Sequence, residues 1–239
     1  MDAFLVVIAF CMAASFAICG IPFGLLIAKW KGDVDVREVG SGNIGMTNVA
    51  RTVGGAAAAL TFACDVGKGA LSMVLSRAAI NAFLVEGATL EHTEPGFAAL
   101  TLVYICCVLG HVYSPYLGFH GGKGISVGLG AALGMYWPLG LSALFVFFLL
   151  VIPTGYISLG SIAAALSIPP EALFLWHFTP WATVPLCFVS LVVVWAHRKN
   201  IIKLMHGEEN RFSIKSRAEK VRRRRRGSVP PTERKEGER

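Results

Sequence analysis

The chain is organised around residues 110–130, GHVYSPYLGFHGGKGISVGLG, in which a cluster of glycines and one lysine lies between two apolar runs. Gly121, Gly122 and Gly124 have no Cβ, so their backbone can adopt positive φ and bring N–H groups close to an anion. Lys123 adds a positive charge, and the apolar residues that follow predict a helix, whose N-terminus also favours a phosphate. The alternative is a flexible turn between two spans, because short glycine-rich patterns often occur without a ligand.

The composition of the chain is that of a membrane protein. Of its 239 residues, 54% are hydrophobic and 15% are charged, and the mean hydropathy is +0.60. These values are too apolar for a soluble domain of this length, so the sequence predicts an all-α integral membrane protein. The six cysteines lie in apolar runs without metal-ligand spacing, so we expect neither a disulfide framework nor a metal.

The hydrophobic runs predict about seven helices, two of them short or re-entrant. The expected ranges are 4–28, 46–63 (short), 68–85, 97–113, 125–135 (short), 138–168 with a break at Pro153, and 180–197. Lys29 and Lys31 follow the first run, whereas residues 86–95 contain three glutamates and no Lys or Arg. The positive-inside rule therefore predicts that the N-terminus is outside and the C-terminus is cytoplasmic.

A second polar stretch, GSGNIGMTN at residues 40–48, follows the first expected span and precedes Arg51. It is rich in hydrogen-bond donors and free of acids, and the Arg51 guanidinium suits phosphate oxygens. The order of span, glycine-rich loop, short helix and long helix occurs over 4–85 and again over 97–168. This internal repeat predicts two short helices whose N-termini face one anion. The alternative is an ordinary turn with an arginine at the lipid headgroups.

A third polar stretch, AHRKNIIKLMHGE at residues 196–208, follows the last expected span. His197, Asn200 and Lys203 recur at helical spacing, so one helix face could present all three to the same site. The alternative is a positive flank that only fixes the topology. Within the spans, Asp65 and Lys68 are expected to pair with each other or with the loops above, because charges are costly at that depth.

The motifs GSGNIGMTNVAR (40–51), DVGKG (65–69), GHVYSPYLGFHGGKG (110–124) and HRKNIIKLMHGE (197–208) together resemble one family. This family is the bacterial membrane glycerol-3-phosphate acyltransferases that take their acyl group from acyl phosphate (the PlsY family). Departures are small: Met46 stands where the family usually has Ala, and Lys203 where it usually has Arg. The resemblance predicts a polytopic acyltransferase domain over 1–212 and a separate basic tail over 213–239.

The resemblance implies transfer of a fatty acyl group from acyl phosphate to the sn-1 hydroxyl of glycerol 3-phosphate, for phospholipid biosynthesis, without a cofactor. The residues that would be catalytic are Ser41, Arg51, Lys123, His197 and Asn200. The residues that would bind substrate are Gly40, Gly42, Asn43, Thr47, Asn48, His111, Gly121, Gly122, Gly124 and Ser126. Glu208 would be a structural partner for nearby cations, and the base would be His197 or a substrate phosphate.

The expected location is the cell inner membrane, with the active site at the cytoplasmic face, where a protein that supplies acyl phosphate is a candidate partner. Residues 215–239 contain 11 Lys or Arg and 4 Asp or Glu, which accounts for the whole net charge of +7. This tail is predicted to be disordered and to bind anionic lipid, with no nucleic acid expected. The rival function is a phosphate or organic-anion transporter, but the outer half of the helices has few of the polar residues that a pathway requires.

Overall fold

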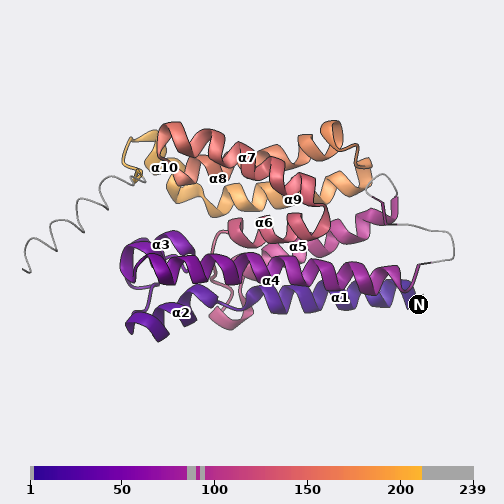
Figure 1. Cartoon of the computed structure of the whole chain (residues 1–239), viewed down its shortest axis with the longest axis horizontal. Coiled ribbons are helices and arrows are strands. Elements are labelled where there is room, and N and C mark those ends of the chain that lie inside the picture. The colour runs from indigo at the N-terminus through magenta and orange to yellow at the C-terminus, as the bar shows by residue number, and fades with distance from the viewer. Residues whose placement is uncertain (1–2, 85–89, 92–94, 212–239) are drawn as a thin grey trace, which may run out of the picture.

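The computed structural model describes residues 3–84, 90–91 and 95–211, and every regular element in these ranges is helical (Figure 1). The α-helices are α1 Ala3–Gly20, α2 Phe23–Gly32, α3 Met46–Thr52, α4 Gly55–Asn81, α5 Ala98–Val112, α6 Ile125–Met135, α7 Trp137–Thr154, α8 Ile157–Pro170, α9 Pro180–Ala196 and α10 Arg198–Met205. Short 3₁₀ turns cover Pro95–Phe97 and Pro115–Leu117, and a π-helical turn covers Glu171–Leu175.

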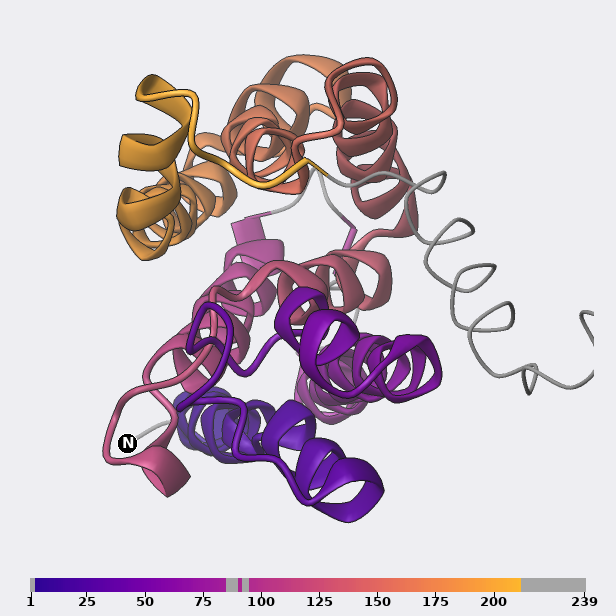
Figure 2. The same cartoon turned by 90° about the vertical axis from the view of Figure 1, so that its left-hand side faces the viewer.

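The long helices form a bundle of three layers. In both views α1 and α4 lie on one side, α7, α8 and α9 lie on the other, and α5 and α6 lie between them (Figures 1 and 2). The core between the layers is built from fully buried side chains such as Tyr104, Met73 and Leu186. Large apolar side chains also point outwards, and Ile152 and Phe145 are 79% and 68% exposed. An apolar exterior of this kind suits lipid and not water.

Five helical segments in the described ranges are long and apolar enough to cross a membrane, and α9 with α10 would make a sixth despite a bend of 60°. Length and composition therefore agree with an integral membrane protein. The helix count differs from the expected seven, because four of the expected helices, 4–28, 46–63, 68–85 and 138–168, are divided differently and α10 is a separate helix. The helices expected over 97–113, 125–135 and 180–197 are confirmed within a residue or two by α5, α6 and α9.

The first expected helix, 4–28, is two helices separated at Ile21 and Pro22. Pro22 has no N–H to donate and disfavours helical backbone at the residue before it, so α1 ends at Gly20. The chain then resumes as α2, whose last turn carries Lys29 and Lys31.

The second pair of expected helices has its break in a different place. The helix does not end at residues 63–68; it breaks at Gly54, whose φ of +130° is accessible to glycine, so α3 has 7 residues and α4 has 27. Gly69, next to Lys68, serves packing instead, as does Gly130 on α6. A Cβ at Gly69 would lie 2.3 Å from the Val127 carbonyl oxygen, and one at Gly130 would lie 2.0 Å from the Val66 carbonyl oxygen. These glycines let α4 and α6 approach each other closely.

The expected helix over 138–168 is also two helices, α7 and α8, and the break is at Gly155 rather than at Pro153. Gly155 has a φ of +75° and caps α7. The expected helix ends at residue 168, whereas α8 continues through Pro170 into the π-helical turn. The internal repeat stays a prediction, since α3 has 7 residues whereas α6 has 11.

The two ends of the bundle differ in what they carry. Ala3 begins α1 at one end, whereas α2, α3 and α10 lie at the opposite end (Figure 1). This arrangement is compatible with chain ends on opposite sides of a membrane, and which side each faces stays a prediction. The basic tail, 213–239, and most of the acidic linker, 86–95, lie outside the described residues.

Candidate active site

Three polar segments from distant parts of the sequence meet at the end that carries α3 and α10. They are the loop before α3, the loop before α6, and the junction of α9 with α10; Figure 2 views this end directly. These are the segments that the sequence singled out, so the predicted site residues do lie at one end of the molecule.

The first segment is held in shape by Asn48, which is 1% exposed. Its Nδ2 donates to the carbonyl oxygens of Val36, at 2.8 Å, and Val39, at 3.0 Å, and its Oδ1 accepts from the Ser41 N–H at 2.9 Å. Gly40 has a φ of +63°, and a Cβ there would lie 2.2 Å from the Asn48 Oδ1. The predicted substrate contacts of Asn48 and Gly40 are untested, but both residues clearly shape the loop.

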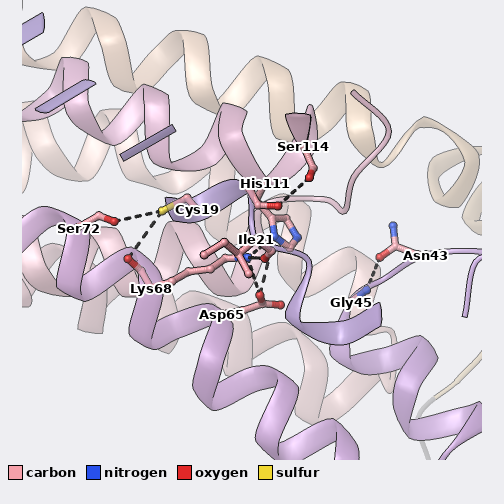
Figure 3. A network of polar contacts seen from close by, with 10 residues as sticks. Cys19, Ile21, Asn43, Gly45, Asp65, Lys68, Ser72, His111 and Ser114 are labelled. Atoms are coloured by element: carbon pink, nitrogen blue, oxygen red, sulfur yellow. Dashed lines mark hydrogen bonds and ion pairs between the residues drawn. The ribbon is translucent and has the colours of Figure 1, made fainter. Parts of the chain in front are cut away.

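The shaped loop leaves several polar groups unpaired. Asn43 is partly engaged, because its Oδ1 accepts from the Gly45 N–H at 2.8 Å (Figure 3), and Gly42 turns the chain with a φ of +69°. Arg51, in the last turn of α3, is exposed and makes no hydrogen bond or ion pair with any described residue. The hydroxyls of Ser41 and Thr47 also have no such partner in the described ranges. Arg51 is therefore free to bind an anion.

The second segment, GGKG at 121–124, does not use its glycines as the sequence suggested. The Gly121 N–H donates to the Val112 carbonyl at 2.9 Å, and the Gly122 N–H donates to the His111 carbonyl at 3.0 Å. The last carbonyls of α5 lack helical partners, and the loop folds back to satisfy them. In this structure these two N–H groups therefore face the end of α5, and substrate binding by Gly121 and Gly122 stays a prediction.

The N–H groups that remain are those of the first turn of α6. Gly124 caps this helix with a φ of +81° and gives no side-chain cap, so the first-turn N–H groups, including that of Ser126, lack a helical partner. At the other end of α6, Arg77 Nη1 donates to the Met135 carbonyl oxygen at 2.9 Å. A cation at the C-terminus complements the helix dipole, which gives Arg77 a role that the sequence left open.

The third segment turns at His197, where α9 meets α10 at 60°. His197 is 2% exposed, and its Nδ1 lies 2.8 Å from the Val193 carbonyl oxygen. A carbonyl can only accept, so Nδ1 carries the proton and Nε2 keeps a free lone pair. This tautomer is the one that a general base requires.

The second and third segments are joined by a chain of three side chains. Lys123 Nζ donates to Asn200 Oδ1, and Asn200 Nδ2 donates to Glu209 Oε1 at 3.0 Å. The other carboxylate oxygen of Glu209 is buried and has no hydrogen-bond partner among the described residues. Glu209 thus fixes the orientation of the Asn200 amide and, through it, the Lys123 ammonium.

The charges around Lys123 show how the segments act on one another. The pKa of Lys123 is lowered from 10.5 to about 8, chiefly by burial; Glu209 opposes this shift, whereas the positive charges of Arg51 and Lys203 contribute to it. Arg51, Lys123 and Lys203, here called the cation cluster, therefore share one electrostatic environment with a single carboxylate. Such an excess of positive charge is suited to an anion with two or more negative charges.

Glu209 is the residue that the sequence analysis missed. The expected partner for cations was Glu208, but Glu208 is exposed and forms no ion pair with a described residue. Its backbone N–H donates to the Lys203 carbonyl at 2.8 Å, and Gly207, with a φ of +70°, turns the chain there. This turn brings Glu209 back to Asn200, and no periodicity in the sequence indicates it.

His111 is the predicted site residue that does not join the cation cluster. It is 5% exposed and lies with Asp65 and Lys68 beneath the GGKG loop. The structure thus groups Arg51, Lys123, His197 and Asn200 at one end, with His111 as a buried support.

The fold and the site define a class: a multi-pass membrane protein with a group of cationic and polar side chains at one end of its helical bundle. A family model described as glycerol-3-phosphate acyltransferase matches residues 9–207. The chain therefore belongs to the glycerol-3-phosphate acyltransferase family.

Individual relatives agree with this membership. The glycerol-3-phosphate acyltransferase of Dinoroseobacter shibae is 38% identical over 205 residues, which cover 85% of this chain and 92% of the relative. The protein of the same name from Synechococcus sp. (strain CC9902) is 35% identical over 208 residues, covering 87% and 96%. The crystal structure of PlsY (YgiH), an integral membrane glycerol 3-phosphate acyltransferase, in its glycerol 3-phosphate form, is similar with a TM-score of 0.75 and 32% identity. That match covers 86% of this chain and 96% of the solved one.

Proposed function

We propose that the protein transfers a fatty acyl group from acyl phosphate to the sn-1 hydroxyl of glycerol 3-phosphate, giving 1-acylglycerol 3-phosphate and inorganic phosphate. The observation that carries this proposal is the cation cluster, in which the charges of Arg51 and Lys203 act on Lys123 at the end of an apolar bundle. Both substrates carry a phosphate, and one of them carries an acyl chain that requires lipid. A phosphate transporter would not need a base beside the anion site, and His197 supplies one.

The cation cluster would hold the two phosphates together against their repulsion. Arg51 has no other partner among the described residues and can bind phosphate oxygens through two parallel N–H groups. Lys123 is held by Asn200, so its ammonium is already placed before substrate arrives. Placement in advance lowers the cost of bringing both reactants into line.

The chemical step needs little activation, because acyl phosphate has a good leaving group. The sn-1 oxygen attacks the acyl carbonyl carbon, a new C–O ester bond forms, and the bond from the acyl carbon to the phosphate oxygen breaks. The hydroxyl proton passes to His197 Nε2, whose lone pair is left free by the contact of Nδ1 with the Val193 carbonyl. The cation cluster and the first-turn N–H groups of α6 stabilise the developing negative charge.

The proposed location is the inner membrane, with the site at the cytoplasmic face. Lys29, Lys31, Arg198 and Lys199 are exposed on the helices at the site end, which is where the positive-inside rule places cytoplasmic residues. The proposed partner is a cytosolic enzyme that makes acyl phosphate and supplies it to this site. Binding of anionic lipid by the basic tail stays a prediction.

The donor is tested with the purified full-length protein in neutral detergent and radiolabelled glycerol 3-phosphate. Palmitoyl phosphate should give labelled lysophosphatidate and an equal amount of inorganic phosphate, and palmitoyl-CoA should give neither. His197→Gln should lower kcat about 100-fold or more, as expected for loss of a general base. His206→Gln alters an exposed histidine nearby and should leave kcat unchanged. Product formation from palmitoyl-CoA alone would contradict the proposal.

A further inference from the structure

A buried ionic network lies directly beneath the GGKG loop. It consists of Asp65 and Lys68 on α4 and His111 on α5, which are 1%, 5% and 5% exposed (Figure 3). The mechanism proposed above uses none of these groups. Charges at this depth are costly, and apolar side chains of similar size would often be as stable or more so. The cost of the network indicates that it serves a purpose beyond stability.

Lys68 is the centre of the network. Its Nζ lies 2.8 Å from Asp65 Oδ1, donates to the Ile21 carbonyl oxygen at 2.7 Å, and lies 3.1 Å from His111 Nδ1. An ammonium group has three protons and no lone pair, so Lys68 donates to Ile21 and His111, while its charge attracts the Asp65 carboxylate, whose Oδ1 accepts no hydrogen bond from a described residue. Any shift of Lys68 must therefore disturb its contacts with the α1–α2 break and with α5 together.

The Ile21 contact ties the network to the break between α1 and α2. The Ile21 carbonyl oxygen at this break accepts from the Phe23 N–H at 3.0 Å and from Lys68 Nζ at 2.7 Å. Ser114, just after α5, donates to the neighbouring Gly20 carbonyl at 2.7 Å (Figure 3). The break, α4 and the end of α5 thus form one rigid support.

The His111 contact ties the network to the GGKG loop. Because Lys68 can only donate, His111 Nδ1 must accept, so the imidazole is neutral with its proton on Nε2. Nε2 lies against Gly122, where an added Cβ would be 2.1 Å away. The His111 carbonyl also accepts the Gly122 N–H at 3.0 Å. His111 therefore holds Gly122 by its ring and by its backbone, and Lys123 is the next residue.

We propose that Asp65, Lys68 and His111 form a positioning network that fixes the GGKG loop, and thereby the Lys123 ammonium, for the phosphate of the acceptor. This inference rests on the proposed function, in which the cation cluster binds the phosphates of both substrates, and it assigns Lys123 to the phosphate of glycerol 3-phosphate and Arg51 to that of acyl phosphate. None of the three residues touches substrate in this account. Lys68 fixes the ring of His111, and His111 fixes the path of Gly122.

The network has a kinetic signature that a purely structural role would not give. A displacement of about 1 Å in a positioned group can cost about 100-fold in rate, so even slight loosening of the loop is measurable. When the network is removed by substitution, the KM for glycerol 3-phosphate should rise about 10-fold or more. The KM for acyl phosphate should change by less than about 3-fold, because Arg51 is carried by a different segment.

Two variants remove the network at different points. Asp65→Asn/Lys68→Met removes both charges and keeps the volume, which avoids leaving one buried charge unpaired. His111→Asn keeps an acceptor for Lys68 but removes the ring beside Gly122. The matched control is Ser72→Ala, which lies one turn from Lys68 on α4, is 2% exposed, and contacts Cys19 Sγ at 3.6 Å rather than the loop.

Both network variants should show the selective rise in the KM for glycerol 3-phosphate with melting temperatures close to that of the parent, and Ser72→Ala should show neither change. A double-mutant cycle tests the contact itself, since Gly122→Ala should cost several-fold less in a His111→Ala background, where the ring is gone. Unchanged KM values in folded network variants would overturn the proposal. So would a parallel rise for both substrates that follows the loss of melting temperature.

Failure of the inference and failure of the proposed function are distinguishable. If the parent protein transfers the acyl group from palmitoyl phosphate, the proposed function stands whatever the network variants do. If the parent shows no transfer, equilibrium dialysis with radiolabelled glycerol 3-phosphate still tests the network. Weaker binding by at least about 10-fold in Asp65→Asn/Lys68→Met, with unchanged binding in Ser72→Ala, would support it, and equal binding in both would refute it.

Discussion

The lowered pKa of Lys123 predicts how activity depends on pH. With a pKa of about 8, roughly nine-tenths of the free enzyme carries a charged Lys123 at pH 7 and about one-tenth does at pH 9. Because the charged form binds phosphate, kcat/KM for glycerol 3-phosphate should fall about tenfold per pH unit above pH 8. Lys123→Arg should lose this alkaline limb, since a guanidinium stays charged over the whole range.

The charged neighbours of Lys123 predict in which direction each substitution shifts the alkaline limb of the pH profile. Glu209 raises the pKa of Lys123, so Glu209→Gln should move the alkaline limb to lower pH. Arg51 and Lys203 lower that pKa, so Arg51→Ala and Lys203→Ala should move the limb to higher pH while they reduce activity. A fold that had merely been weakened would not shift the limb in opposite directions.

The assay is the initial rate at subsaturating glycerol 3-phosphate from pH 6 to pH 10 in neutral detergent, corrected for spontaneous hydrolysis of acyl phosphate. An identical alkaline limb in the parent and in Lys123→Arg would refute the assignment of the limb to Lys123. A shift of the Glu209→Gln limb to higher pH would refute the electrostatic account of the cluster.

Three further predictions follow from single contacts. Arg51→Ala should cost about 2–4 kcal/mol in kcat/KM, with partial recovery in Arg51→Lys, and equal kinetics in all three proteins would refute its role. Gly122→Ala should raise the KM for glycerol 3-phosphate at least 10-fold and change kcat less, because the methyl would lie 2.1 Å from His111 Nε2; an unchanged KM would show that the ring gives way. Arg77→Leu should cost about 1–3 kcal/mol of stability in detergent unfolding, since it leaves the Met135 carbonyl unpaired, and an unchanged midpoint would refute the capping role.

The sequence predicted the class of fold and several helices well. The ranges of α5, α6 and α9 follow from apolar runs that end at glycine, proline or polar residues, and those signals are local. Errors in the helix boundaries arose at glycines, because a glycine can either break a helix or allow two helices to pack closely. The stretch DVGKG at 65–69 interrupts the apolar run and suggested a break, but Gly69 packs α4 against α6, and the break occurs at Gly54. Such close approach depends on a distant helix, so no local pattern reveals it.

The candidate site could be predicted as a set of residues but not as a set of contacts. The internal repeat and the family resemblance placed Arg51, Lys123 and Asn200 in one site, and the structure places them at one end of the bundle. The spacing did not show that Glu209 orients Asn200, because the turn at Gly207 sets that contact. The roles of the site residues in catalysis stay predictions.

The internal polar groups were the hardest to predict, because their partners are far away in the sequence. Asp65 and Lys68 were expected to pair, and their 2.8 Å separation confirms this. The additional contacts of Lys68, to Ile21 and His111, span 47 and 43 positions along the chain. A single sequence holds no signal for pairs at that separation.

The most direct test of the central claim is whether the site recognises phosphate on both substrates. The measurement is ³¹P NMR of the full-length protein in neutral detergent with palmitoyl phosphate and either glycerol 3-phosphate or glycerol, compared with Lys123→Met. The account predicts one inorganic phosphate per lysophosphatidate formed from glycerol 3-phosphate, with the acyl group at sn-1. It predicts no acylation of glycerol, and at least about 100-fold slower reaction in Lys123→Met. Acylation of glycerol at the rate of glycerol 3-phosphate, with Lys123→Met as active as the parent, would contradict it.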